Sequence, residues 1–312
     1  MTVARARARG SARARVSARA RITGSEQFAG WAFVTPGVAI ILLFGAVPVI
    51  WSAVMSFQRN NLLSPSTPYV GLRNYRAMLH DPVVAQALGH TLVYTALFVP
   101  GTMIAGLFLA MAMNRKIRFI TFYRTAAYAT MAISTISEAI VFIWLFDPSY
   151  GVVNYLFNRL GIPQQQFLNS PSEALYVIVI MTIWGWTGFA VVIYLAALQG
   201  IPQPLIDAAA TDGASRWQTF RRVTLPLLSP ASLFLAVWLT INALQLFDEV
   251  YLSTQGGPLN STSVLVYYLY EQAFQDFNFG YASAIAYFLF LIILVVTAIQ
   301  FRVGRRFTYY RS

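Results

Sequence analysis

Six long apolar stretches constrain this chain more than any other feature of its sequence. A helix needs about 20 largely apolar residues to cross the hydrocarbon layer of a membrane. Hydrophobic residues make up 57% of the 312 and charged residues only 11%, whereas soluble domains carry about 25% charged residues. The sequence therefore predicts an all-α integral membrane domain, residues 28–301, with six transmembrane helices at 28–57, 91–113, 119–146, 174–198, 230–252 and 281–301.

The distribution of basic residues predicts how these spans are oriented. All but four of the 22 Lys and Arg residues lie in the tail 1–27, around the turn after the second span, in the connection 199–229, or in the tail 302–312. The opposite connections hold the other four: Arg59, Arg73, Arg76 and Arg159. Because cytoplasmic flanks collect Lys and Arg, we expect both termini and the connection 199–229 to be cytoplasmic.

The N-terminal tail, residues 1–27, carries seven arginines and no acidic residue before Glu26. Such a run could be a nucleic-acid-binding arm or an organellar transit sequence. We interpret it as a disordered basic anchor, because a polybasic segment beside a span is attracted to the anionic inner leaflet. No nucleic-acid partner is expected.

Residue types that many functions require are missing or isolated. The chain has no cysteine, and neither His80 nor His90 has a carboxylate or second histidine at metal-ligand spacing, so we expect no metal site. The single lysine, Lys116, does not belong to a GxxxxGK motif, so the chain cannot build that type of phosphate-binding loop. No catalytic residues and no bound cofactor are expected, and any nucleotide that drives this protein is bound by another chain.

The connection 199–229 is unusually polar and helix-prone for a chain of this composition. Pro202 and Pro204 predict a turn, and 205–211 reads as a short helix with Asp207 in its first turn, where a carboxylate suits the positive helix end. Three alanines, 208–210, give this helix a nearly bare surface that a partner's backbone could approach. Gly213 can adopt positive φ and stop the helix.

A second short helix is predicted immediately after this break. Ser215 and Gln218 have the spacing of a capping box, in which each residue bonds the backbone N–H of the other. Trp217 and Phe220 then recur on one face, and Pro226 and Pro230 are expected to end the helix and direct the chain back into the bilayer. The sequence predicts a helix-turn-helix that lies along the membrane surface.

Residues 207–230 resemble the EAA loop of bacterial ABC importer permeases, a pattern of roughly E-A-A-x-x-D-G-A followed by F, L-P and P. The match covers Asp207, Ala208, Ala209, Asp212, Gly213, Ala214, Phe220, Leu225, Pro226 and Pro230. Asp207 stands where the family usually has glutamate. In that family the loop is a coupling helix seated in a cleft of the ATPase, so the resemblance implies ATPase coupling by Asp207, Ala208, Ala209, Ala210, Asp212, Gly213, Ala214, Arg216, Phe220 and Pro226.

The resemblance extends over nearly all of 28–301. Segments 70–79, 146–161 and 247–274 are similar to external segments of carbohydrate-type permeases of the maltose and glycerol-3-phosphate importer type. This implies the fold of a type I ABC importer permease in a bacterial inner membrane. It also implies four kinds of partner: a second permease chain, two ATP-binding cassette subunits that carry ATP and Mg²⁺, an external solute-binding protein, and the bilayer.

Polar residues within the spans are candidates for the solute path. Glu138 is a carboxylate inside the third span, where an ionisable residue is either functional or a structural group between packed helices. Asn242, Gln245 and Glu249 are expected to share one face of the fifth helix, with Asp248 beside them and Trp238 as an aromatic neighbour. Hydroxyl-rich solutes need such hydrogen-bonding groups, with aromatic surfaces for the sugar ring.

Three other functions compete with sugar import. Glycerol-3-phosphate or a glycerophosphodiester is the alternative cargo, but residues 230–301 contain no Arg or Lys to pair with a phosphate. A secondary transporter calls for intramembrane acid–base relays or inverted repeats of broken helices, and Glu138 alone supports it. A membrane-embedded enzyme is disfavoured, because no HExxH or GxSxG motif and no paired intramembrane aspartates are present.

Overall fold

The computed structural model describes residues 28–61, 66–115 and 118–307 of the chain. They form two compact units, Met1–Met55 and Ser56–Ser312. The described part of the chain is helical and contains no strand beyond one isolated bridge between Gln58 and Tyr69, which confirms the all-α prediction. The predicted tail 1–27 lies outside the described residues, as do 308–312 of the C-terminal tail.

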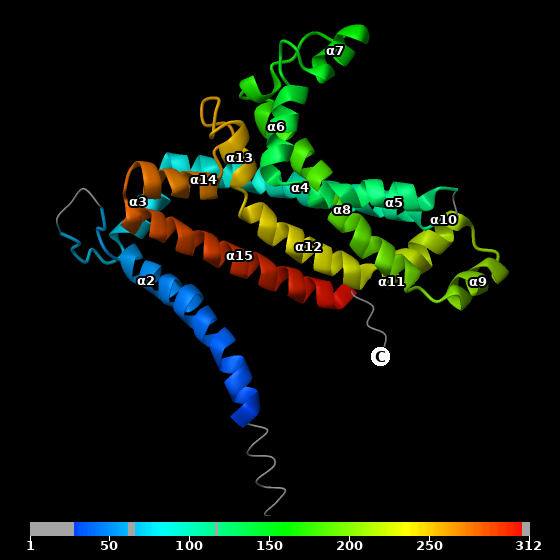
Figure 1. Cartoon of the computed structure of the whole chain (residues 1–312), viewed down its shortest axis with the longest axis horizontal. Coiled ribbons are helices and arrows are strands. Elements are labelled where there is room, and N and C mark those ends of the chain that lie inside the picture. Colours follow the sequence, from blue (N-terminus) through cyan, green and yellow to red (C-terminus); the bar gives the residue numbers. More distant parts are fainter. Residues whose placement is uncertain (1–27, 62–65, 116–117, 308–312) are drawn as a thin grey trace, which may run out of the picture. The chain divides into compact units, whose positions relative to one another are not determined.

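The first unit contributes one long helix, Phe28–Ser56, which includes the π-turn η1 (Leu42–Ala46) and α2 (Val47–Ser56). The second unit holds the remaining helices (Figure 1). These are α3 (Arg73–Leu79), α4 (Pro82–Met113), α5 (Ile120–Ala129), α6 (Thr135–Leu145), α7 (Val152–Arg159), α8 (Ala174–Gln199), α9 (Gln203–Thr211), α10 (Arg216–Thr219), α11 (Leu225–Leu227), α12 (Ser229–Leu244), α13 (Asp248–Ser253), α14 (Leu265–Tyr270) and α15 (Phe279–Phe307). Short 3₁₀ and π segments connect some of them: η2 (Thr130–Ala132), η3 (Phe167–Asn169), η4 (Phe220–Thr224) and η5 (Glu271–Gln275).

The described residues include four helices long and apolar enough to cross a membrane, or up to six if each of two bent pairs forms one span. The four are Phe28–Ser56, α4, α8 and Phe279–Arg305 within α15. One bent pair joins Ile120–Ala132 to Thr135–Leu145 at 102°, and the other joins Arg216–Leu227 to Ser229–Leu244 at 62°. This agrees with the six-span architecture expected from the sequence.

Two spans differ from the uninterrupted helices expected at 119–146 and 230–252. The first bends because Ile133 and Ser134 are extended, with ψ of 129° and 142°. The second ends at Leu244, and α13 begins afresh at Asp248. By contrast, α4 begins nine residues earlier than expected because Asp81 caps it, accepting a hydrogen bond from the Val83 amide at 2.9 Å, with Pro82 in its first turn.

The main core of the second unit lies between α4 and α8. Tyr94 and Phe98 of α4 are almost fully buried, and so are Ile178 and Tyr194 of α8. A Cβ atom on Gly106 would lie 3.1 Å from the carbonyl carbon of Ala190. The two helices therefore approach each other through small residues, as is common between membrane helices.

The other long helices pack on this pair. α12 packs against α4 and α15, and the Gln300 amide donates to the Thr240 hydroxyl at 2.8 Å. In Figure 1 these long helices run side by side, with α9 and α10 at one end and α3 and α14 at the other. The start of α5 and the C-terminal end of α15 lie at the α9–α10 end, so three of the four basic segments of the sequence share that end.

Asp81 links three helices at the opposite end. Its Oδ2 accepts hydrogen bonds from Tyr268 of α14 at 2.8 Å and from Tyr281 of α15 at 2.6 Å. Burial alone would raise the pKa of Asp81, but these phenol donors and two backbone amides outweigh that effect and hold its pKa below the ordinary value. The carboxylate therefore stabilises this end of the unit in its charged form.

The Asp81→Asn variant should be less stable than the wild type at neutral pH, and the difference should decrease in acid. Because the folded-state pKa is lowered, the stabilisation is complete above the unfolded-state pKa, which is about 3.9, and is lost as pH falls through the folded-state pKa. Melting temperatures at pH 7 and pH 3 measure this: we expect a deficit of a few degrees at pH 7 that shrinks at pH 3. Tyr268→Phe should give part of the same deficit, and an equal deficit at both pH values contradicts the assignment.

Candidate functional site

The connecting loop, residues 199–229, begins with a short helix that starts after an extended proline and is closed by hydrogen bonds at its C-terminal end. Pro202 is extended, with ψ of 125°, and α9 starts directly after it. At the other end Gly213 has φ of +72°. The backbone N–H of Ala214 donates to the carbonyl oxygen of Ala209, and the backbone N–H of Gly213 donates to the carbonyl oxygen of Ala210, both at 3.0 Å. This pair of bonds around a left-handed glycine is a Schellman motif. Gly213 therefore adopts positive φ and ends the helix, as predicted from the sequence.

The second half of the connecting loop opens with the predicted capping box. The backbone N–H of Gln218 donates to Ser215 Oγ at 3.3 Å, and the backbone N–H of Ser215 donates to Gln218 Oε1 at 2.8 Å. A continuous helical run, residues 216–227, follows, and Trp217 and Phe220 lie 5.5 Å apart between ring centroids. Both predicted features of this helix, its cap and its aromatic face, are present.

Pro226 does not end this helix, as the sequence had suggested; the run continues to Leu227 and bends at Leu228. A proline inside a helix removes one N–H and crowds the carbonyl four residues earlier. Here the π-turn η4, residues 220–224, ends two residues before Pro226 and includes the residue four positions before it, and a wider turn relieves that crowding. The same order occurs in the first unit, where η1 precedes Pro48.

The outer face of the connecting loop is formed by small and charged side chains. Among the residues assigned to it from the sequence, the exposed ones are Asp207, Ala208, Ala210, Asp212, Gly213 and Arg216, of which Ala210 and Arg216 also line the cavity on the inner side. Ala209, Ala214 and Phe220 are half-buried, because the inner face of the loop adjoins the ends of α4 and α8 around a cavity of about 340 Å³. The Asp207 carboxylate accepts a hydrogen bond from Gln203 at 3.0 Å. The loop thus presents a smooth surface outward and contacts two long helices inward.

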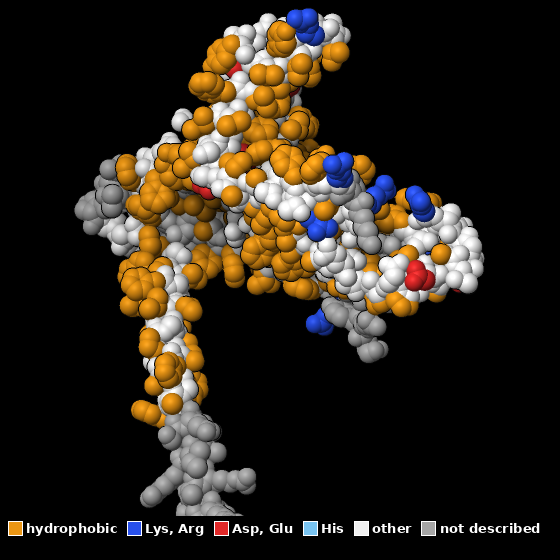
Figure 2. Space-filling model, turned by 45° about the vertical axis from the view of Figure 1, so that its right-hand side comes forward, with side chains coloured by type: hydrophobic (Ala, Val, Ile, Leu, Met, Phe, Trp, Pro, Cys, Tyr) orange, Lys and Arg blue, Asp and Glu red, His pale blue; other side chains and the backbone are white. Residues whose placement is uncertain are grey.

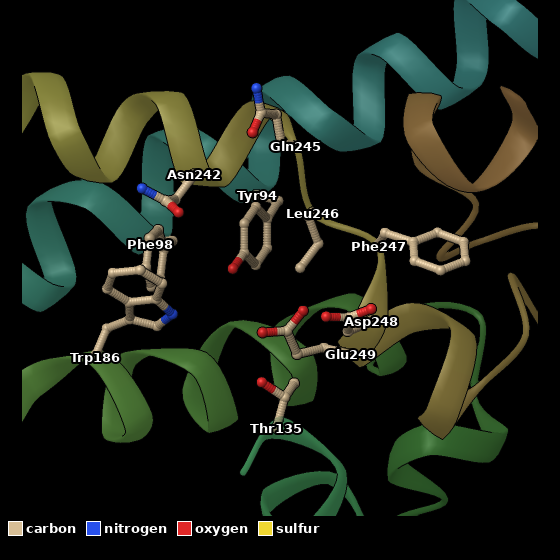
Figure 3. Close-up of a pocket in the computed structure, with 10 residues that line it drawn as sticks. All are labelled: Tyr94, Phe98, Thr135, Trp186, Asn242, Gln245, Leu246, Phe247, Asp248 and Glu249. Atoms are coloured by element: carbon tan, nitrogen blue, oxygen red, sulfur yellow. The ribbon is translucent and has the colours of Figure 1, made fainter. Parts of the chain in front are cut away.

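A second site is a cavity of about 200 Å³ in the middle of the unit, where four of the predicted solute-path residues meet (Figure 3). Asn242 and Gln245 come from the end of α12, and Asp248 and Glu249 come from α13. The opposite walls are Tyr94 and Phe98 of α4, Thr135 of α6 and Trp186 of α8. Figure 3 places Tyr94 between Trp186 and Glu249.

The geometry of this cavity corrects two details of the prediction. Asn242, Gln245 and Glu249 do not share one helical face, because α12 ends at Leu244 and the chain is non-helical until Asp248. The aromatic partner is Trp186 rather than Trp238, which contacts Phe234 and Phe189 and lines neither cavity. Tyr94, Phe98 and Thr135 were not predicted, because no local pattern marks contacts between residues so far apart in sequence.

Glu138 lines an adjoining cavity of about 230 Å³, bounded by the bend between α5 and α6 and by Gly185 and Phe189 of α8. Its side chain is only 7% exposed, and no described residue donates a hydrogen bond to its Oε1. A Cβ atom on Gly185 would lie 2.5 Å from either carboxylate oxygen, so the absence of a side chain there makes room for the acid. Thr135 and Trp186 line both cavities and separate them.

The two cavities together are acidic. Among their described lining residues, Glu138, Asp248 and Glu249 are carboxylates and none is Arg, Lys or His. The described residues contain no group of three or more His, Cys, Asp and Glu side chains that could hold a metal ion. Hydroxyl, amide and carboxylate groups beside aromatic rings are suited to hydrogen-bonding a hydroxyl-rich solute.

Comparison with known sequences identifies a family. Residues 102–309 match the family described as binding-protein-dependent transport system inner membrane component. A probable ABC transporter permease of Pyrococcus horikoshii is 37% identical over 85% of this chain and 91% of its own length. A lactose transport system permease of Rhizobium radiobacter is 36% identical over 88% of this chain and 94% of its own length.

Solved structures agree on the fold. A chain of a bacterial ABC transporter that imports alginate aligns with a TM-score of 0.82, covering 93% of this chain and 100% of that chain at 24% identity. This likeness concerns the fold alone. From the apolar helices, the importer fold and the match over 102–309, it follows that the chain is a multi-pass membrane permease of the family of binding-protein-dependent transport system inner membrane components, and not an enzyme.

Proposed function

We propose that this permease carries a sugar or sugar-like solute across the inner membrane, powered by ATP hydrolysis on separate subunits. The cavity residues Asn242, Gln245, Asp248, Glu249 and Glu138 form the solute path in this proposal. Relatives named for lactose and for trehalose and maltose support a carbohydrate cargo, and they match 88% and 90% of this chain respectively. The solute is delivered by an external binding protein.

The observation that carries the proposal is the construction of the connecting loop. Its outer face is smooth, its inner face adjoins α4 and α8, and it continues into α12 through a single bend of 62°. We propose that the outer face of residues 207–213 seats in an ATPase subunit that holds ATP and Mg²⁺, with Ala214 and Arg216 at its edge, where they also line the cavity against α4. Closure of two such subunits then moves the loops of this chain and a second permease chain together, and each loop rotates its attached helices as a rigid body.

The proposed orientation places both termini and the connecting loop in the cytoplasm. Figure 2 shows Lys and Arg side chains gathered at the end of the second unit where α10 lies. Arg59, Arg73, Arg76 and Arg159 lie on other segments of the chain. This asymmetry is the one expected of a protein whose basic end faces the cytoplasm.

Cavity charge favours a neutral cargo over glycerol-3-phosphate or a glycerophosphodiester, although one relative is a glycerol-3-phosphate permease. The described residues that line the two cavities include no cation that could pair with a phosphate. Neutral hydroxyl groups, in contrast, can both donate to the carboxylates and accept from the Asn242 and Gln245 amides.

Reconstitution of the importer tests the function. A thermal-shift panel of neutral sugars and glycerol-3-phosphate on the binding protein first identifies the cargo. Uptake of that cargo is then measured in proteoliposomes with and without the ATPase subunits. We expect a neutral sugar to stabilise the binding protein and uptake to require the ATPase; uptake at the full rate without it contradicts the proposal.

The Glu138→Ala variant should take up the sugar about ten to a hundred times more slowly than the wild type. Loss of a hydrogen bond to a charged acceptor costs about 1.5–3 kcal/mol, which corresponds to that range. Glu138→Gln, which keeps the shape and one acceptor oxygen, should lose less. Glu271→Ala removes an acid that lines neither cavity and serves as the control. Wild-type uptake by Glu138→Ala removes Glu138 from the path.

A further inference from the structure

An apolar groove of about 430 Å³ lies between one face of α4 and the start of the helical run 216–227. Its lining consists of Ile104, Leu107, Phe108, Met111, Arg216, Trp217 and Phe220. The four α4 residues recur at intervals of three and four, so they form one face of the helix. Phe108 is 71% exposed and Trp217 is 66% exposed, so the groove is open along its length.

A polar cavity adjoins the groove and supplies positive charge. This is the cavity of about 340 Å³ beneath the connecting loop, and it shares Met111, Arg216 and Phe220 with the groove. The cavity is also lined by Asn114 and Arg115, which directly follow the end of α4. The described lining residues of groove and cavity include no Asp or Glu.

The two parts are arranged along the axis of α4. Ile104 precedes the last residue of α4, Met113, by nine residues, or roughly 14 Å of helix. Arg115 follows that residue by two. The Arg124 guanidinium, 3.0 Å from the Met113 carbonyl oxygen, adds a further positive charge at the same helix end. Hydrocarbon surface therefore runs parallel to the helix, and cationic donors stand at the end where the helix leaves the membrane.

We propose that this groove binds one anionic phospholipid, with an acyl chain along α4 and Trp217 and its phosphate between Arg216 and Arg115. Basic pockets beside membrane helices on the cytoplasmic side bind anionic headgroups, and guanidinium groups match phosphate geometry. The groove offers an apolar surface for an acyl chain, and the adjoining cavity offers cationic side chains for a phosphate. An anionic phospholipid carries both groups. Because the connecting loop forms one wall, a bound lipid holds α10 against α4.

Native mass spectrometry of the full chain tests the proposal. The purified chain is incubated with equal amounts of palmitoyl-oleoyl phosphatidylglycerol and palmitoyl-oleoyl phosphatidylcholine, and the bound lipid is counted. We expect preferential retention of phosphatidylglycerol. Inorganic phosphate at millimolar concentration should not displace it, because the acyl chain carries part of the binding.

Two loss-of-binding variants, one conservative variant and two matched controls localise the site. Arg216→Gln should lower phosphatidylglycerol retention about fivefold, since one basic side chain near the membrane surface contributes about 1 kcal/mol to binding an anionic lipid. Arg216→Lys should restore most of it, which a misfolded variant cannot do. Trp217→Ala should weaken retention of both lipids. The controls, Arg76→Gln and Trp144→Ala, replace exposed residues outside the groove; Trp144 is 68% exposed, close to Trp217.

Three results would overturn the proposal. The first is equal retention of the two lipids by the wild type. The second is unchanged phosphatidylglycerol retention in both groove variants. The third comes from the assembled importer, in which a photoreactive phosphatidylglycerol should label the groove peptides of α4 and α10; absence of label there means that a partner subunit covers the groove instead.

Discussion

The Gly106→Val variant should lose roughly 10 °C of thermal stability and much of its yield in the membrane. Gly106 is buried against Ala190 of α8, and an added Cβ would clash with the Ala190 Cβ and approach its carbonyl carbon at 3.1 Å. Backbone atoms cannot move aside as a flexible side chain can. Overpacking costs about 1–3 kcal/mol and sometimes more, and for a domain of this size each kcal/mol shifts the melting temperature by about 2–4 °C.

Gly89→Val is the matched control for this prediction. It makes the same substitution in the same helix, α4, at a position where an added Cβ meets nothing within 4 Å. Any effect of the change in helix propensity or of the β-branched shape of valine is common to both variants. Differential scanning fluorimetry of the two proteins in the same detergent separates them. Equal melting temperatures would show that the α4–α8 contact is not as close as described.

The Ala208→Glu variant should abolish ATP-dependent uptake while leaving the chain folded. Ala208 is exposed on the outer face of α9, so a larger side chain creates no clash inside this chain. If that face seats in an ATPase subunit, a glutamate places both bulk and an unpaired charge in a packed interface, and we expect a decrease of at least tenfold. Uptake and co-purification of the ATPase are measured separately, because either step can fail.

Ala208→Ser is the control for the proposed contact between α9 and the ATPase subunit. It adds one hydroxyl at the same position and should retain most of the uptake. A melting temperature equal to that of the wild type shows that each variant is folded. Normal uptake by Ala208→Glu, with the ATPase still bound, would show that α9 does not contact the ATPase through this face, whatever the family resemblance implies.

Local chemistry made the connecting loop predictable from the sequence. Pro202 before α9, Pro204 in its first turn, the left-handed Gly213 and the capping box of Ser215 and Gln218 act within a few residues. Turns and caps of this kind are specified by the residues that form them. The apolar spans were predictable for a similar reason, since length and composition alone decide whether a helix can cross a bilayer.

The breaks at Ser134 and Gln245 could not be predicted in the same way. No proline or glycine occurs in residues 130–135 or 242–249, so nothing local marks either break. Both sit where α6 and α13 pack against each other and α8, which indicates that tertiary packing sets them. Trp186 and Tyr94 were missed for a related reason: helices that are apolar all round show no face that points to a cavity.

The shared wall between the two cavities limits what this chain can hold at one time. Thr135 and the half-buried Trp186 divide the space into compartments of about 200 Å³ and 230 Å³. Pockets for ligands the size of a drug molecule occupy about 300–1,000 Å³. Each compartment alone is smaller than that range, so a disaccharide bound by this chain would extend past the indole of Trp186 or out through the open side of the cavity.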